Sequence, residues 1–131
     1  MKKEQALSTD KAPAAIGPYS QGAQAGPFVF TAGQVPVDPA TKEMPADLPG
    51  QARQVMENLR GVLAAAGLGF EHVVKATVFM TNLGDFVPFN EIYEEYFEGT
   101  TPPARSAFQV AALPLGAQIE IEMVAYRGEQ S

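Results

Sequence analysis

Apolar residues recur at helical spacing in two stretches of the chain. After Pro49 they return every three or four positions, which predicts an amphipathic helix that ends at Gly67 in a left-handed cap. A second helix is expected between Asp85, as its cap, and Gly99. The apolar positions that share a side are Val55, Met56, Leu59, Val62, Leu63 and Ala66 in the first helix, and Phe86, Phe89, Ile92, Tyr93, Tyr96 and Phe97 in the second.

Shorter runs rich in β-branched and apolar residues predict strands near 15–24, 27–34, 73–80, 105–113 and 118–126. The run 73–80 is typical of a strand covered on both faces for most of its length. In the last run, Ile119, Ile121 and Met123 alternate with Glu120 and Glu122, so the two kinds of residue face opposite sides. Residues 1–10 are expected to form a loose arm.

The elements follow in the order β-β-α-β-α-β-β, which predicts an α+β fold. Two helices cannot cover both faces of such a sheet, so both should lie on one face. The other face still carries apolar side chains and is expected to be buried against partner subunits. The length of 131 residues fits a single domain over residues 1–131.

Composition narrows the function. The net charge of −6 counts against a general nucleic-acid binder, and the lack of cysteine excludes disulfides and thiolate sites. A single histidine, His72, cannot build a His-rich metal cage within one chain. The N-terminus has no apolar run of the secretory type and no stretch is long enough to span a membrane, so we expect a soluble cytoplasmic protein.

Arg105 is the first residue suited to chemistry. It follows Pro102-Pro103-Ala104 and opens a predicted strand, where a guanidinium can clamp a substrate carboxylate by two hydrogen bonds. An ordinary surface ion pair is the alternative.

Glu120 and Glu122 are candidate proton acceptors, because a partly buried carboxyl has a raised pKa and can move a proton through bound water. The pattern does not choose between them, and a solvated sheet face explains both. Asn90, at the edge of the second helix's apolar side, either binds a ligand or satisfies a backbone group. Tyr19 either covers a pocket or packs at a subunit contact.

Several mechanisms lack their residues. No nucleophile elbow accompanies His72, which disfavours a Ser-His-Asp triad. Neither a GxGxxG fingerprint nor a P-loop is present, so no nucleotide cradle is predicted.

The sequence resembles the Rid (YjgF) family of imine deaminases. The resemblance spans about residues 8–127 and is carried by segments in the family's order: Ile16-Gly17-Pro18-Tyr19-Ser20-Gln21, Ala32-Gly33-Gln34-Val35-Pro36-Val37, Gln51-Ala52-Arg53-Gln54, Val74-Lys75-Ala76-Thr77-Val78-Phe79, Pro103-Ala104-Arg105-Ser106 and Ile119-Glu120-Ile121-Glu122. It implies a chorismate-mutase-like fold, a mixed sheet with two helices on one face, assembled as a homotrimer with clefts between subunits.

The resemblance also implies a reaction: hydrolysis of 2-imino acids, or their enamine tautomers, to 2-oxo acids and ammonia, without cofactor or metal. Arg105 would hold the substrate carboxylate and Glu120 would orient and deprotonate water. Tyr19, Gly33 and Asn90 would line the cleft, and Ala107 would keep its backbone groups there.

Two positions depart from the family pattern. Ala32 stands where a serine is usual, and Ala107 where a cysteine is common. A lost hydroxyl removes a hydrogen bond worth roughly 0.5–1.5 kcal/mol, so we expect deamination with altered rate or preference. The two losses motivate an alternative, a non-catalytic sensor of small carboxylates that uses the same cleft. A ribonuclease is disfavoured by the charge and the lack of a usable histidine.

Overall fold

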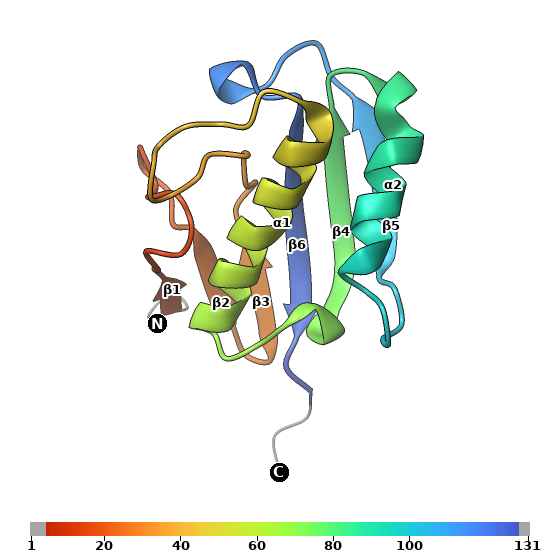
Figure 1. Ribbon diagram of the computed structural model, residues 1–131. Helices are drawn as coiled ribbons and strands as arrows, with labels where there is room; N and C mark the ends of the chain where they lie inside the picture. The colour runs from red at the N-terminus through yellow and green to blue at the C-terminus, as the bar shows by residue number, and fades with distance from the viewer. Residues whose placement is uncertain (1–4, 129–131) are drawn as a thin grey trace.

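The computed structural model describes residues 5–128, which form one six-stranded sheet with two helices on one of its faces (Figure 1). The elements are β1 (Gln5–Leu7), β2 (Gly22–Ala25), β3 (Phe28–Thr31), α1 (Leu48–Ala65), β4 (Val73–Met80), α2 (Phe86–Glu95), β5 (Ala104–Gln109) and β6 (Ile119–Tyr126). The strand order is β1-β2-β3-β6-β4-β5. Among the described strands only β4 and β5 pair in parallel, and α2 makes the crossover that a parallel pair requires. The predicted mixed sheet with helices on one face is confirmed.

The helix α1 packs over β3 and β6, and α2 lies beside it (Figure 1). All six positions predicted for the inward side of α1 are buried. The helix begins one residue before Pro49, because Asp47 caps it by accepting a hydrogen bond from the Gly50 N–H at 2.9 Å. Gly67 has a φ of +75°, which confirms the left-handed cap.

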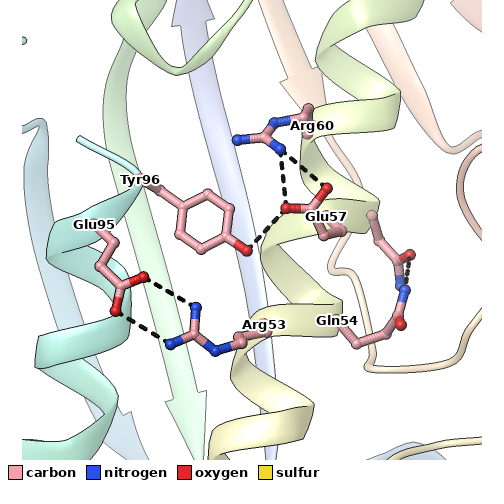
Figure 2. Close-up of polar contacts among 7 residues, drawn as sticks. Arg53, Gln54, Glu57, Arg60, Glu95 and Tyr96 are labelled. Carbon is pink, nitrogen blue, oxygen red and sulfur yellow. Dashed lines mark hydrogen bonds and ion pairs between the residues drawn. The ribbon is translucent and has the colours of Figure 1, made fainter. Parts of the chain in front are cut away.

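Polar side chains join the two helices on their outer side (Figure 2). Arg53 donates two hydrogen bonds to Glu95, at 3.0 and 3.2 Å, and the Tyr96 hydroxyl donates to Glu57 at 2.9 Å. Glu57 also accepts from Arg60. Exposed pairs of this kind contribute little to stability, so the buried apolar side chains between helices and sheet hold the layers together.

The two faces of the sheet differ in cover. In β4, Ala76, Val78 and Met80 are buried under the helices, while Lys75 and Phe79 on the other face are only half-buried. The expectation that 73–80 is covered on both faces is therefore not met within one chain. Large apolar side chains on the uncovered face are strongly exposed: Phe28 by 40%, Phe30 by 45% and Phe108 by 52%. We call this surface the open face.

The N-terminal part corrects two predictions. The strand predicted near 15–24 is only β2, because Gly17 has a φ of +135° and the Tyr19 N–H donates to its carbonyl, which makes a turn. The predicted loose arm contains β1, which pairs with β2; the first four residues of that arm lie outside the described part of the chain.

Other element ends differ by a few residues. The strands predicted for 27–34, 105–113 and 118–126 are β3, β5 and β6, of which β3 and β5 are shorter. Asp85 precedes α2 as predicted, but its side chain makes no capping hydrogen bond. The helix ends at Glu95 and turns continue to Gly99, whose φ is +77°.

Candidate functional site

Arg105 lies on the helix-covered face of the sheet. It is the second residue of β5 and is paired with Ala76, which faces the helices. Its Nη1 donates a hydrogen bond of 2.7 Å to Oδ1 of Asn90 on α2. Its guanidinium carbon also lies within cation–π range of three α2 rings, 5.0 Å from the centroid of Phe86, 5.8 Å from Phe89 and 4.9 Å from Tyr93. The side chain is thus held by α2 rather than by an ordinary surface carboxylate.

A cleft of about 740 Å³ adjoins this arginine. Its wall combines apolar surface, two exposed carboxylates and the guanidinium, from Asn90, Tyr93, Glu94, Phe97, Glu98, Pro102, Pro103 and Arg105. An arginine in such a hollow can bind a small carboxylate.

Glu120 lies on the open face. It is paired with Phe79 of β4, three residues from Ala76, so it projects to the side opposite Arg105. Its carboxyl packs directly over Gly33: a Cβ at residue 33 would overlap Oε2 of Glu120 and lie 2.9 Å from its Cδ. The close approach therefore requires glycine at position 33.

Burial raises the pKa of the Glu120 carboxyl above its ordinary value, and the nearby charge of Glu122 adds to this increase. Glu122 itself is exposed. The two carboxylates that the sequence pattern left equivalent thus differ in burial, and Glu120 is the stronger candidate for a proton acceptor.

The two groups cannot meet within one chain. Arg105 and Glu120 lie on strands separated by β4 and three residues apart in register, which puts their Cα atoms about 14 Å apart with side chains on opposite faces. Each is therefore half of a candidate site: Arg105 with Asn90 on the helix face, and Glu120 with Gly33 on the open face.

Two of the predicted site residues remain, Tyr19 and Ala107. Tyr19 is 54% exposed in the loop before β2, and its hydroxyl accepts a hydrogen bond of 3.4 Å from the Ile16 N–H. Ala107 is half-buried against the core, two residues after Arg105. The Ala32 N–H donates to the Gln21 carbonyl, so its backbone ties the residue before Gly33 to the loop that carries Tyr19.

Sequence reasoning missed two features of the site. The buried amide of Gln21 donates to the carbonyls of Thr9, Ala12 and Pro13 and accepts from the Thr9 N–H, which fixes the loop next to Tyr19. The contact of the α2 rings with Arg105 was also missed, because their helical spacing indicated only a core.

His72 has a different place. Its Nδ1 accepts a hydrogen bond of 3.1 Å from the Gly69 N–H in the turn before β4. Between residues 5 and 128, no group of three or more acidic or histidine side chains is arranged to hold a metal ion, and no helix is long and apolar enough to cross a membrane. The cofactor-free reaction and the cytoplasmic location stay predictions.

Comparison with known proteins places the chain in a family. The family described as Endoribonuclease L-PSP matches residues 9–127. Protein DfrA of Myxococcus xanthus is 55% identical over 123 residues, 92% of this chain and 93% of that protein. The 2-iminobutanoate/2-iminopropanoate deaminase of Escherichia coli strain K12 is 48% identical over 92% of this chain and 96% of that protein. The crystal structure of E. coli TdcF with bound serine superposes with a TM-score of 0.93 at 46% identity, covering 95% of this chain and 100% of that one.

The chain therefore belongs to the Rid (YjgF) family, as the resemblance predicted, and has that family's chorismate-mutase-like fold.

Proposed function

We propose that this protein hydrolyses reactive 2-imino acids, or their enamine tautomers, to 2-oxo acids and ammonia. The observation that carries the proposal is the placement of Glu120, a half-buried carboxyl with a raised pKa that is packed over Gly33 on the open face. The names of its relatives support the reaction class, since one is a 2-iminobutanoate/2-iminopropanoate deaminase and another a putative reactive intermediate deaminase, TdcF.

The chemistry needs few protein groups. Arg105 binds the substrate carboxylate and so orients the C=N bond. Glu120 takes a proton from a water molecule while the water oxygen bonds to the carbon of the protonated imine, which gives a neutral carbinolamine. Return of that proton to nitrogen makes an ammonium leaving group. The C–N bond then breaks as Glu120 takes the proton of the carbinolamine hydroxyl, so that ammonia leaves and the 2-oxo acid remains. Tyr19, Gly33, Asn90 and the backbone at Ala107 line the cleft.

The site is shared between two copies in a homotrimer. Arg105 and Glu120 lie on opposite faces of one sheet, so a working pair requires Arg105 of one copy and Glu120 of the next. The exposed phenylalanines of the open face supply an apolar surface for such packing.

Mixing two inactive variants tests the shared site. Wild-type protein should accelerate 2-oxo acid release when threonine dehydratase supplies the imine, whereas the Arg105→Ala and Glu120→Gln variants should each lose this effect. If the two variants are unfolded and refolded together in equal amounts, random assembly restores about one site in four. Each variant refolded alone is the control.

Each outcome has a distinct meaning. Wild-type protein that binds 2-oxobutanoate but leaves imine decay unchanged would establish the alternative, a non-catalytic carboxylate sensor. Full activity of Arg105→Ala would remove the carboxylate clamp from the mechanism. Individually inactive variants whose mixture stays inactive would refute the division of the site between copies.

A further inference from the structure

Four residues on one side of α2 contact the guanidinium of Arg105. Phe86, Phe89, Asn90 and Tyr93 stand at positions i, i+3, i+4 and i+7, so they share one face of the helix. Asn90 makes the hydrogen bond to the guanidinium, and the three rings lie within 6 Å of it.

The rings form a fixed surface. Phe89 is fully buried and Tyr93 is 6% exposed. Their centroids are 5.4 Å apart, and those of Phe86 and Phe89 are 6.1 Å apart, so each ring is packed against its neighbour. Close packing of this kind resists rearrangement.

We propose that Tyr93 is a positioning residue for Arg105: its ring, supported by Phe89 and Phe86, holds the guanidinium in the orientation that receives the substrate carboxylate. This inference rests on the proposed function. A guanidinium is planar and weakly hydrated, so it can lie against aromatic rings while its N–H groups remain available for a carboxylate. Asn90 takes one of the five N–H groups, and the others serve the substrate.

Holding the side chain in advance improves binding. A free arginine loses rotamer freedom when it clamps an anion, and that cost is removed if the protein has already fixed the side chain. The clamp acts on a carboxylate that is present in both ground state and transition state, so its loosening raises KM more than it lowers kcat.

The ring carries this role, and the hydroxyl does not. Within residues 5–128 the Tyr93 hydroxyl is buried and has no hydrogen-bond partner. Tyr93→Phe therefore keeps the contact with Arg105, whereas Tyr93→Leu removes it. This matched pair separates the two parts of the side chain.

Phe70 offers a control outside the site. It is buried to a similar degree, belongs to the same aromatic cluster through Phe97, and lies 5.6 Å from the guanidinium carbon of Arg60 rather than Arg105. Phe70→Leu thus makes a comparable cavity and removes a comparable cation–π contact at a different arginine.

The experiment measures KM for 2-iminobutanoate, the Kd of 2-oxobutanoate by calorimetry, and the NMR resonance of the Arg105 Nε–H, assigned by its loss in Arg105→Lys. Tyr93→Leu should raise KM and Kd about tenfold and change the ring-current shift of that resonance, since the Phe86 and Phe89 rings remain. Tyr93→Phe should restore all three to near the wild-type values, and Phe70→Leu should lower the melting temperature without altering them. If Tyr93→Leu fails to fold, the half-buried Phe86 provides Phe86→Leu, with the same expected direction.

An unchanged Kd and resonance in Tyr93→Leu, or in Phe86→Leu as its substitute, would overturn the inference. So would equal losses in Phe70→Leu, which would indicate general destabilisation, or a Tyr93→Phe variant as defective as Tyr93→Leu. The resonance needs no catalytic activity, so wild-type protein without deaminase activity would defeat the proposed function while still testing the contact between Tyr93 and Arg105.

Discussion

Adding one methyl group at Gly33 should disable the enzyme without unfolding it. In Gly33→Ala the new Cβ would overlap Oε2 of Glu120 and lie 2.9 Å from its Cδ. Gly33 is not among the glycines with positive φ, so alanine fits its backbone conformation, and the three atoms nearest to the new Cβ all belong to the Glu120 side chain.

The size of the effect follows from that conflict. To restore ordinary van der Waals separation, the carboxyl must move by about 1 Å. A displacement of about 1 Å in a catalytic group costs on the order of 100-fold in rate. Because the moving group is the end of a flexible side chain, the free energy of unfolding should change by less than about 1 kcal/mol. We expect a kcat about 100-fold lower, with KM nearly unchanged since Arg105 is untouched.

Steady-state kinetics with enzymatically supplied 2-iminobutanoate and urea denaturation provide the two measurements. Gly69→Ala is a matched control, because a Cβ there would also overlap a glutamate oxygen, Oε1 of Glu71, which lies in an exposed turn. It should keep the wild-type kcat. Wild-type kinetics in Gly33→Ala, or an equal loss in Gly69→Ala, would refute the reasoning.

Three further predictions concern charge and capping. In the pH profile of kcat/KM, the acid limb should lie above the ordinary glutamate pKa, because Glu120 must be ionised to accept a proton. Glu122→Gln should move that limb to lower pH, because it removes a charge that raises the pKa of Glu120. An unmoved limb would contradict the contribution of Glu122. Because the pKa of Glu120 is raised in the folded protein, stability is lost as the pH rises through that pKa. Glu120→Gln should therefore increase the urea midpoint at neutral pH but not in acid. Urea denaturation curves at both pH values check this. Asp47→Ala should destabilise the protein by about 1 kcal/mol without changing kcat, since it removes only the cap of α1; a loss of kcat would show that α1 acts on the site.

The elements with strong periodicity could be predicted from sequence. The β4 strand has the predicted bounds because an apolar run with β-branched residues lies between two turns. The short strand β1 could not be predicted, because three residues with no clear alternation acquire their conformation by pairing with β2. The stretch before β2 was misread since Gly17 turns the chain where composition favoured a strand.

The candidate residues could be named from sequence, but their grouping could not. The alternation in β6 put Glu120 and Glu122 on one face, yet only the approach of Gly33, far away in the chain, distinguishes their surroundings. The helical spacing predicted the burial of Tyr93 correctly, whereas Phe86 is only half-buried. A periodic pattern does not reveal that a strand beyond the next loop brings an arginine over those rings. Contacts between residues distant in sequence depend on register and turn lengths, which composition does not encode.

The separation of Arg105 from Glu120 by the thickness of the sheet also affects how the protein can evolve. The side chains that hold the arginine belong to α2, and the glycine that the glutamate packs over belongs to the segment after β3. Within one chain, substitutions in the two groups should have additive effects on the free energy of unfolding. A lineage can therefore exchange residues on one helix while the packing of Glu120 over Gly33 in the same chain is inherited unchanged.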